Sequence, residues 1–362
     1  MKTKLFIMAV TSVALLAACE KDRDGVFQGA DGQGSGKQIT KTTSIRVDKS
    51  YDNYSLRYTY GSADAIKVSW SGSNPANYEY FYYEDGAEVL DERDNISYVY
   101  DGGMLKEIKG IYNDETETHY ITYTGDQPTE IYSSYDDGWC RKTITYTNGK
   151  VHEITEQFSS GNSYRYKQLW DGDNVVREEV YRSDGSLEQT HDYIYDNKHR
   201  PTRLNLALAL AWGNSGPGIS ANNVIMENIT YNDGYTSPVS YSSTYTYDSD
   251  YPVKCVRTKI HNNTSGSYTQ YSRTTYYEYS DGTGRGQVPQ IYTINVQRNV
   301  DDWGYVYSSV TNEYAAGSTA VIYAEAKYGY EFRQWSDGNT DNPRAITVNA
   351  NATYTAIFGS SK

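Results

Sequence analysis

Cysteine is the residue type in this sequence whose chemistry is easiest to weigh. Cys140 and Cys255 lie far apart, and neither belongs to a Cys-x-x-Cys pair. Their spacing therefore gives no support to thiol redox catalysis or to a zinc site. In an exported chain a disulfide between Cys140 and Cys255 can persist, and two free, buried cysteines are an equally ordinary alternative.

The remaining polar residues show no catalytic motif. The five histidines have no metal-ligand spacing, and the chain has neither a Gly-x-Ser-x-Gly elbow nor a phosphate loop. His191 precedes Asp192, but no residue marks a nucleophile for them. The acidic turns 171–174 and 248–250 carry oxygen ligands that suit calcium, yet neither matches the twelve-residue calcium loop. We therefore expect no enzymatic activity, no metal and no cofactor.

Aromatic residues are the other group with binding chemistry. The chain has 40 tyrosines among its 362 residues, together with Trp139 and Trp170 in the middle of the sequence. Exposed tryptophan and tyrosine rings can stack on sugar rings. The alternative, which we favour, is that these aromatics form the core of a sheet in a chain that is poor in aliphatic residues.

The charge balance narrows the choice of partners. The chain has 33 basic and 46 acidic residues, a net charge of −13, and loss of Lys2 and Lys4 with a leader would make it −15. A protein that binds nucleic acid needs a basic surface, so we expect no nucleic-acid partner.

Residues 1–18 have the pattern of a signal peptide, with Lys2 and Lys4 before an apolar segment too short to span a bilayer comfortably. Leu16-Ala17-Ala18-Cys19 resembles the bacterial lipobox, which implies lipid modification of Cys19 (palmitate among its acyl chains) and attachment to a membrane. Ordinary secretion is the alternative. The charged residues 20–24 resemble the export tag of surface lipoproteins in Bacteroidetes-type bacteria, and a plain tether is the alternative reading. We therefore expect an outer-membrane lipoprotein exposed at the cell surface, with a periplasm-facing position left open.

Residues 19–42 are expected to form a flexible tether, and residues 43–282 a tyrosine-rich β-domain. Tyr-x-Tyr pairs such as Tyr98/Tyr100 recur about every 20 residues, separated by Asp-Gly and Asn-Gly turns. Residues two apart face the same side of a strand. The pattern predicts an all-β fold, with a long meandering antiparallel sheet of repeated hairpins whose closure cannot be read from the pattern. The apolar run 204–212 interrupts the rhythm. Its alternating leucines argue for a strand, whereas Leu and Ala favour helix, and we favour a short helix or plug packed on the sheet over a strand or a ligand or partner patch.

Two resemblances extend this picture. Tyr193-Ile194-Tyr195-Asp196-Asn197-Lys198 and Tyr245-Thr246-Tyr247-Asp248 resemble the Tyr-Asp (YD) repeats of Rhs-type proteins and, more closely, a family of uncharacterised Bacteroidetes lipoproteins. After a linker at 283–289, residues 290–359 resemble the divergent internalin B-repeat domain of bacterial surface proteins, through Gly329-Tyr330-Glu331-Phe332-Arg333-Gln334-Trp335-Ser336-Asp337-Gly338. That likeness implies a small grasp-like β-domain used as a stalk or adhesion repeat. Phe332 and Trp335 are expected in its core, with Trp335 as a binding residue the alternative.

The sequence leaves three functional hypotheses. The first is a non-enzymatic, lipid-anchored scaffold that displays an adhesion-type domain to a surface protein or cell-wall partner. The second is a glycan-binding lipoprotein that uses Trp139 and Trp170. The third is a hydrolase, because a catalytic carboxylate pair is defined by its separation in space, which the sequence does not supply. The oligomeric state is not predicted.

Overall fold

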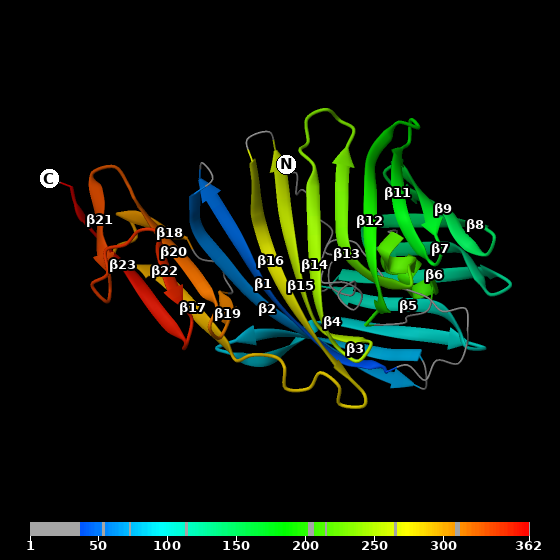
Figure 1. Ribbon diagram of the computed structural model, residues 1–362, viewed down its shortest axis with the longest axis horizontal. Coiled ribbons are helices and arrows are strands. Elements are labelled where there is room, and N and C mark those ends of the chain that lie inside the picture. Colours follow the sequence, from blue (N-terminus) through cyan, green and yellow to red (C-terminus); the bar gives the residue numbers. More distant parts are fainter. Residues whose placement is uncertain are drawn as a thin grey trace.

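The computed structural model describes residues 37–361, apart from 53–54, 72–73, 113–114, 202–205, 214–215, 264–265 and 308–311. The leader, Cys19 and most of the tether lie outside these residues. The described part is all-β, as predicted, with a large antiparallel sheet followed by a small separate β-domain (Figure 1). No helix within it is long and apolar enough to cross a membrane.

The large sheet is a closed barrel of sixteen described strands, in which each strand pairs with its neighbours in the chain and β1 pairs with β16. Its strands are β1 (Ile39–Asp52), β2 (Ser55–Ser71), β3 (Asn74–Glu84), β4 (Ala87–Asp101), β5 (Met104–Tyr112), β6 (Glu115–Thr124), β7 (Gln127–Tyr135), β8 (Gly138–Thr147), β9 (Lys150–Phe158), β10 (Ser163–Asp171), β11 (Asn174–Arg182), β12 (Leu187–His199), β13 (Asn222–Tyr231), β14 (Val239–Asp248), β15 (Tyr251–Asn263) and β16 (Gly266–Tyr279). The first strand thus begins within the stretch assigned to the tether.

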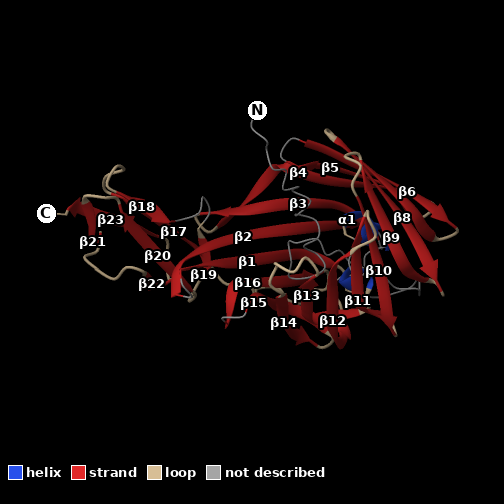
Figure 2. Cartoon of the chain, turned by 90° about the horizontal axis from the view of Figure 1, so that it is seen from above, coloured by secondary structure: helices blue, strands red, loops and turns tan. Residues whose placement is uncertain are grey.

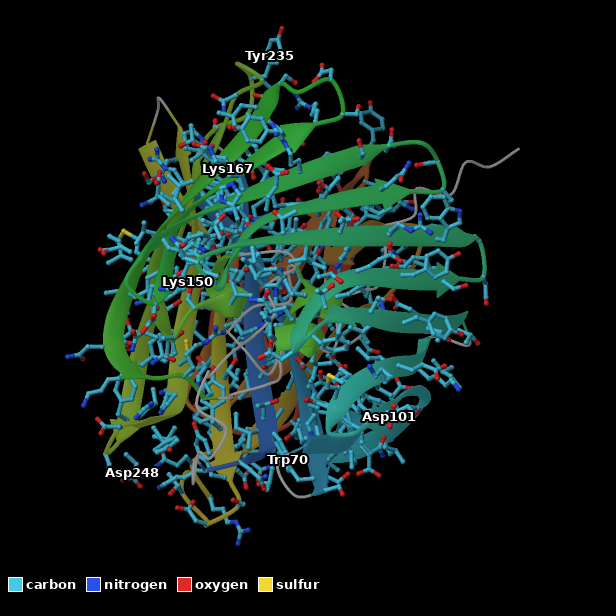
Figure 3. The ribbon with its side chains drawn as sticks, turned by 90° about the vertical axis from the view of Figure 1, so that its right-hand side faces the viewer. Trp70, Asp101, Lys150, Lys167, Tyr235 and Asp248 are labelled. Carbon is cyan, nitrogen blue, oxygen red and sulfur yellow. The ribbon has the colours of Figure 1, made fainter. Side chains whose placement is uncertain are left out.

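The tyrosine repeat has a structural basis at the ends of the even-numbered strands. In six hairpins that turn at the end of an even-numbered strand the pairing register shifts directly before an aromatic residue, which then pairs with the residue five positions later. These pairs are Trp70 and Pro75, Tyr100 and Leu105, Tyr123 and Pro128, Tyr146 and Val151, Trp170 and Val175, and Tyr247 and Pro252. Trp70, Asp101 and Asp248, which lie at such hairpins, are spread along the lower part of Figure 3, and Tyr235 lies at the top.

Hydrogen bonds link these aromatics into an aromatic belt, which comprises Trp70, Tyr100, Tyr123, Tyr146, Trp170, Tyr195, Tyr247 and Tyr279. Most members donate a hydrogen bond to the backbone carbonyl of the residue that pairs with the preceding belt member. The donors and acceptors are Tyr100 and Pro75 at 3.1 Å, and Tyr123 and Leu105, Tyr146 and Pro128, Trp170 and Val151, Tyr195 and Val175, and Tyr279 and Pro252 at 2.7 Å each. A tyrosine can fill the interior and still satisfy a backbone carbonyl with its hydroxyl, which phenylalanine or leucine cannot do.

The run 204–212 contains a helix, as predicted. Helix α1 (Leu206–Trp212) lies inside the barrel and is followed by the 3₁₀ turn η2 (Gly216–Ile219) (Figure 2). The side chains of residues 207–211 are buried in one apolar cluster with inward-facing strand residues such as Ile131 and Ile154. Leucine and alanine favour helix, and the interior supplies apolar surface on several sides. The insertion therefore plugs the barrel.

The outward-facing side chains of the barrel wall are largely polar. Across β8 to β12 they form ion pairs between neighbouring strands, including Arg165 with Glu153 at 3.5 Å and Arg177 with Asp192 at 2.7 Å. Along each strand these residues alternate with buried ones such as Ile154. On this side of the barrel the outer face is thus mostly polar, while the inner face combines apolar residues with a few buried polar ones such as Glu156.

The C-terminal domain consists of two small sheets. Its strands are β17 (Ile291–Arg298), β18 (Gly304–Tyr307), β19 (Glu313–Ala315), β20 (Thr319–Ala326), β21 (Tyr330–Trp335), β22 (Arg344–Thr347) and β23 (Ala352–Ser360), in the orders β19-β17-β23-β21 and β18-β20-β22. Trp335 has no exposed surface and packs with Phe358, and Phe332 packs against the same cluster. Both predicted core residues are therefore in the core, and Trp335 is not a binding residue.

The domain is fixed to the outer face of β1 and β2 by a polar and aromatic joint. The Tyr314 hydroxyl lies 3.0 Å from both the hydroxyl and the carbonyl oxygen of Thr59, and the Val321 amide donates to the Thr59 hydroxyl at 2.8 Å. Tyr58 stacks on Tyr307 with ring centres 4.9 Å apart. At Gly61 a Cβ atom would collide with the Glu313 carbonyl, so only glycine allows this approach. The joint is a fitted contact.

Candidate functional site

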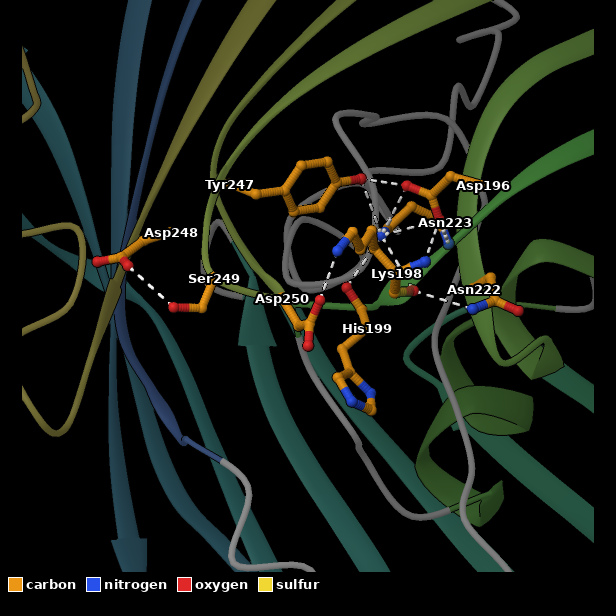
Figure 4. A network of polar contacts seen from close by, with 9 residues as sticks. All are labelled: Asp196, Lys198, His199, Asn222, Asn223, Tyr247, Asp248, Ser249 and Asp250. Carbon is orange, nitrogen blue, oxygen red and sulfur yellow. Dashed lines mark hydrogen bonds and ion pairs between the residues drawn. The ribbon is translucent and has the colours of Figure 1, made fainter.

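The aromatic belt is interrupted where the insertion enters, between β12 and β13. Tyr247 does not bind a backbone carbonyl as the other belt tyrosines do. Its hydroxyl donates instead to the Asp196 carboxylate, which also accepts a hydrogen bond from the Asn223 backbone amide at 3.1 Å (Figure 4). The Asn223 side chain donates to the His199 carbonyl at 2.9 Å. The network replaces the missing belt contact and fixes the entry to the plug.

Nearby, Lys198 pairs with Asp250 at 2.5 Å, which ties β12 to the turn between β14 and β15. The lysine therefore compensates one of the carboxylates of the predicted acidic turn 248–250. No group of three or more metal-ligating side chains occurs among the residues that the structure describes.

A second polar cluster lies inside the barrel under the plug. Lys142 donates to the buried carbonyls of Leu210 and Ala211, in the last turn of α1, at 3.2 and 3.1 Å. A cation at the C-terminal end of a helix can donate hydrogen bonds to the last carbonyls, and it interacts favourably with the negative end of the helix dipole. Lys142 also lies 3.8 Å from the Glu156 carboxylate. The wall of the barrel thus holds the plug through one buried lysine.

Cys140 and Cys255 do not form the disulfide that the sequence left open, because Cys140 is a free and buried thiol. Cys140 is on β8 and Cys255 on β15, which stand on opposite sides of the ring of strands. The Cys140 thiol donates to Glu156 at 3.6 Å. Burial, followed by the charge of Glu156, raises the pKa of the Cys140 thiol to about 12, so it stays protonated and unreactive.

Three interior side chains have the order of a hydrolytic relay. The His119 ring lies 2.7 Å from the Ser133 hydroxyl through Nδ1, and 3.0 Å from the Glu117 carboxylate through Nε2. A serine hydrolase uses these groups in this order, but its serine must reach the substrate. Ser133 has no exposed surface, and His119 and Glu117 are also buried. We read the contact as a buried polar cluster of the interior that no substrate can reach.

Another buried cluster joins β12, β13 and β15. Glu227 accepts a hydrogen bond from Arg257 at 2.6 Å and lies 2.8 Å from Nδ1 of His191. Burial alone would raise the pKa of Glu227, but His191 and Arg257 outweigh it and hold that pKa below its usual value. His191 therefore partners a structural carboxylate across the sheet, whereas Asp192 faces outward and pairs with Arg177.

Two exposed tyrosines of the C-terminal domain, Tyr305 and Tyr328, lie with half-buried neighbours at one place, which we call the distal tip. It comprises Trp303, Tyr305, Lys327, Tyr328 and Tyr330. The rings of Trp303 and Tyr330 are 5.1 Å apart and 18° from parallel, and the Lys327 ammonium lies 4.9 Å from the centre of the Tyr305 ring. Tyr328 is fully exposed and Tyr305 is 49% exposed. No other described residue of this domain is a large hydrophobic side chain with comparable exposure.

The tip points away from the barrel. Strand β20 contacts β2 near its start, where Val321 meets Thr59, and it ends beside the tip, where Ala326 pairs with Gly304. Six residues of strand separate Val321 from Lys327, a distance of about 20 Å. Tyrosine and tryptophan at an exposed, ordered site are the residues that most often anchor a protein partner.

The two tryptophans predicted as ligand aromatics are separated by the fold. Trp170 belongs to the aromatic belt, where its indole N–H is taken by the Val151 carbonyl. Trp139 is on the outer face of β8, where it stacks against Tyr132. Cys19, the predicted lipidation site, lies outside the described residues. The tip was not predicted, although two Gly-Tyr turns, Gly304-Tyr305 and Gly329-Tyr330, mark it in the sequence.

One family model matches the chain: the divergent InlB B-repeat domain, over residues 294–362. This confirms the resemblance predicted for the C-terminal domain, and it fits a protein of the cell envelope or surface. No curated protein matches the chain. Among solved structures the chain is similar to a porin-like protein from Bacteroides uniformis ATCC 8492, with a TM-score of 0.44, 13% identity, and coverage of 67% of this chain and 96% of that one. The resemblances of the barrel region to Tyr-Asp repeats and to a lipoprotein family stay predictions.

Proposed function

We propose that this protein is a non-enzymatic, lipid-anchored component of the cell envelope whose plugged barrel presents the distal tip to a surface protein or glycan. The observation that carries the proposal is the combination of a fitted joint and an exposed aromatic tip on one domain. A flexible stalk needs neither of them.

The joint supports a presenting role because it fixes the direction of the tip. Arg57 adds to it, donating to the Tyr323 hydroxyl at 3.0 Å and covering the Tyr323 ring at 4.6 Å. A binding site that is held rigidly loses less conformational entropy on association than one on a mobile linker. The barrel is then the base that gives the domain a defined orientation.

The charged outer wall supports attachment through lipid at Cys19 and not through the barrel. A barrel that spans a membrane presents an apolar band to the lipid, and a charged side chain there costs about 2–4 kcal/mol at the midplane. Arg165, Glu153, Arg177 and Asp192 are outward-facing neighbours on this wall. Each CH₂ of an acyl chain contributes about 0.8 kcal/mol to membrane binding, so several chains on Cys19 would suffice as the anchor.

The proposal is tested by measuring how the purified chain binds to the isolated envelope of the cells that express it. We expect Trp303→Ala and Tyr328→Ser each to weaken binding at least tenfold, since hot-spot aromatics typically contribute more than about 1.4 kcal/mol. Tyr235→Ser is the matched control, because Tyr235 is 94% exposed but lies in a turn of the barrel. Equal binding by all four proteins would contradict the proposal.

A further inference from the structure

The outer surface of β6, β7 and β8 carries a row of side chains that the proposed function does not use. Tyr120 and Tyr132 stand directly opposite each other, and Arg141 stands opposite Tyr132 on the next strand. Trp139 stacks on Tyr132, with ring centres 6.2 Å apart and planes at 26°. We call these four residues the outer aromatic row.

The row faces solvent. The residues next to it in the chain, such as Ile131, Ser133 and Cys140, are buried in the interior, and successive side chains of a strand point to opposite faces. Tyr120 is 49% exposed. The aromatic belt needs none of these rings, because its members lie at the ends of the strands. Three adjacent strands place the row on a surface about 10 Å wide.

The charges beside the row compensate one another. Arg141 lies 3.7 Å from Glu130, and Lys109 lies 3.1 Å from Glu107, the residue opposite Tyr120. The Arg141 guanidinium also lies 5.8 Å from the centre of the Tyr132 ring. The charges left near the row are the exposed carboxylates Asp136 and Asp137 in the turn before Trp139, and together with the net charge of −13 they disfavour a polyanionic ligand.

Hydrogen-bonding groups flank the rings. Thr118 and Ser134 point outward beside Tyr120 and Tyr132 and are opposite each other in the sheet. A ligand that suits the row offers flat apolar faces to the rings and hydroxyl groups to these side chains and to the ion pairs. Pyranose sugars combine both features. We propose that the outer aromatic row binds a neutral polysaccharide. The site is independent of the distal tip, so either can be wrong without the other.

Native affinity electrophoresis of the full chain tests the proposal, using gels that contain a neutral α-glucan, a neutral β-glucan, a mannan or polygalacturonate. We expect at least one neutral polymer to retard the protein and polygalacturonate to retard it less. Trp139→Ala and Tyr120→Ala should each raise the apparent Kd at least fivefold. Tyr235→Ala is the matched control with an exposed tyrosine elsewhere on the barrel, and Tyr328→Ser reports on the distal tip. Neither should change the retardation.

Using both Trp139→Ala and Tyr120→Ala separates a loss of binding from a loss of folding. Tyr120 is half exposed, so its removal takes little apolar surface from the core. Urea unfolding midpoints show whether each variant is folded. The proposal is overturned if no neutral polymer binds, if polygalacturonate binds best, or if folded Trp139→Ala and Tyr120→Ala bind as tightly as the parent. Loss of polysaccharide binding in Tyr328→Ser alone would overturn it as well, and would move the glycan site to the distal tip.

Discussion

Lys142 is expected to hold the plug in the barrel, and Lys142→Met tests this. The substitution keeps most of the apolar stem but leaves the Leu210 and Ala211 carbonyls without their donor and removes the cation beside Glu156. The Lys142 and Glu156 side chains are only 7% and 9% exposed. Removing one partner of a buried ion pair typically costs about 3–5 kcal/mol. Glu156 keeps a hydrogen bond from Tyr166 at 2.9 Å, so we expect the lower end of that range.

The assay is urea unfolding with linear extrapolation, in which a loss of stability lowers the midpoint without changing the slope. Adding Glu156→Gln to Lys142→Met should recover part of the loss, because the buried charge is then removed. Lys167→Met is the control, since Lys167 is on the outer side of β10 (Figure 3). Amide exchange in residues 206–212 should rise in Lys142→Met only. A midpoint equal to that of Lys167→Met, with unchanged exchange, would refute the role of Lys142.

Three further predictions address the anchor, the belt and the joint. Cys19→Ala should abolish metabolic labelling with palmitate and release the protein from membranes without detergent. Unchanged labelling would contradict lipid attachment at Cys19. Tyr146→Phe should lower the free energy of unfolding by about 1–2 kcal/mol, because it leaves the Pro128 carbonyl without its hydrogen-bond donor. Tyr181→Phe is the control and should have no such effect, because the Tyr181 hydroxyl bonds only Glu179 on the outer face. Equal effects of the two variants would argue against a stabilising role of the belt. Burial, with the nearby Asp85 and Glu84, raises the pKa of Glu313 to about 7. Its folded-state pKa thus exceeds its unfolded value, so folding binds protons and stability falls as pH rises from about 4.5 through 7, by at most about 3 kcal/mol. Urea midpoints at pH 5.5 and 8.5 should differ in the parent and much less in Glu313→Gln, and a larger difference in the variant would contradict this.

Local patterns of the sequence predicted the hairpins and the helix, because both depend on residues close in the chain. The recurring Tyr-x-Tyr units such as Tyr98/Tyr100 set a period-2 face, and Leu and Ala at 204–212 favour helix in any apolar surrounding. The meandering order of the strands could be predicted as well, because short turns join antiparallel strands that are neighbours in the chain. The role of the second tyrosine in units such as Tyr98/Tyr100 and Tyr193/Tyr195, as a donor to a carbonyl of the neighbouring strand, could be seen only from the register.

Closure and the sites depended on contacts between distant residues. Pairing of β1 with β16 brings Ser44 and Thr275 within 3.1 Å, and nothing local marks that contact. Whether Cys140 and Cys255 pair could not be decided from the sequence for the same reason, since strand order decides which wall each cysteine occupies. The sequence around Trp139 and Trp170 does not show which face of the sheet each side chain takes. The structure places Trp139 on the outer face and Trp170 in the aromatic belt. The distal tip was missed because two loops form it, around Trp303 and Tyr328.

The central claim, that the distal tip meets a partner at the cell surface, is tested most directly by site-specific photocrosslinking in intact cells. p-Benzoylphenylalanine in place of Tyr328 should give a discrete crosslinked product on irradiation, and the same residue in place of Tyr235 should give none. Both positions are almost fully exposed, so they differ in location and not in access. Absence of a product at 328, or the same products at both positions, would contradict the account.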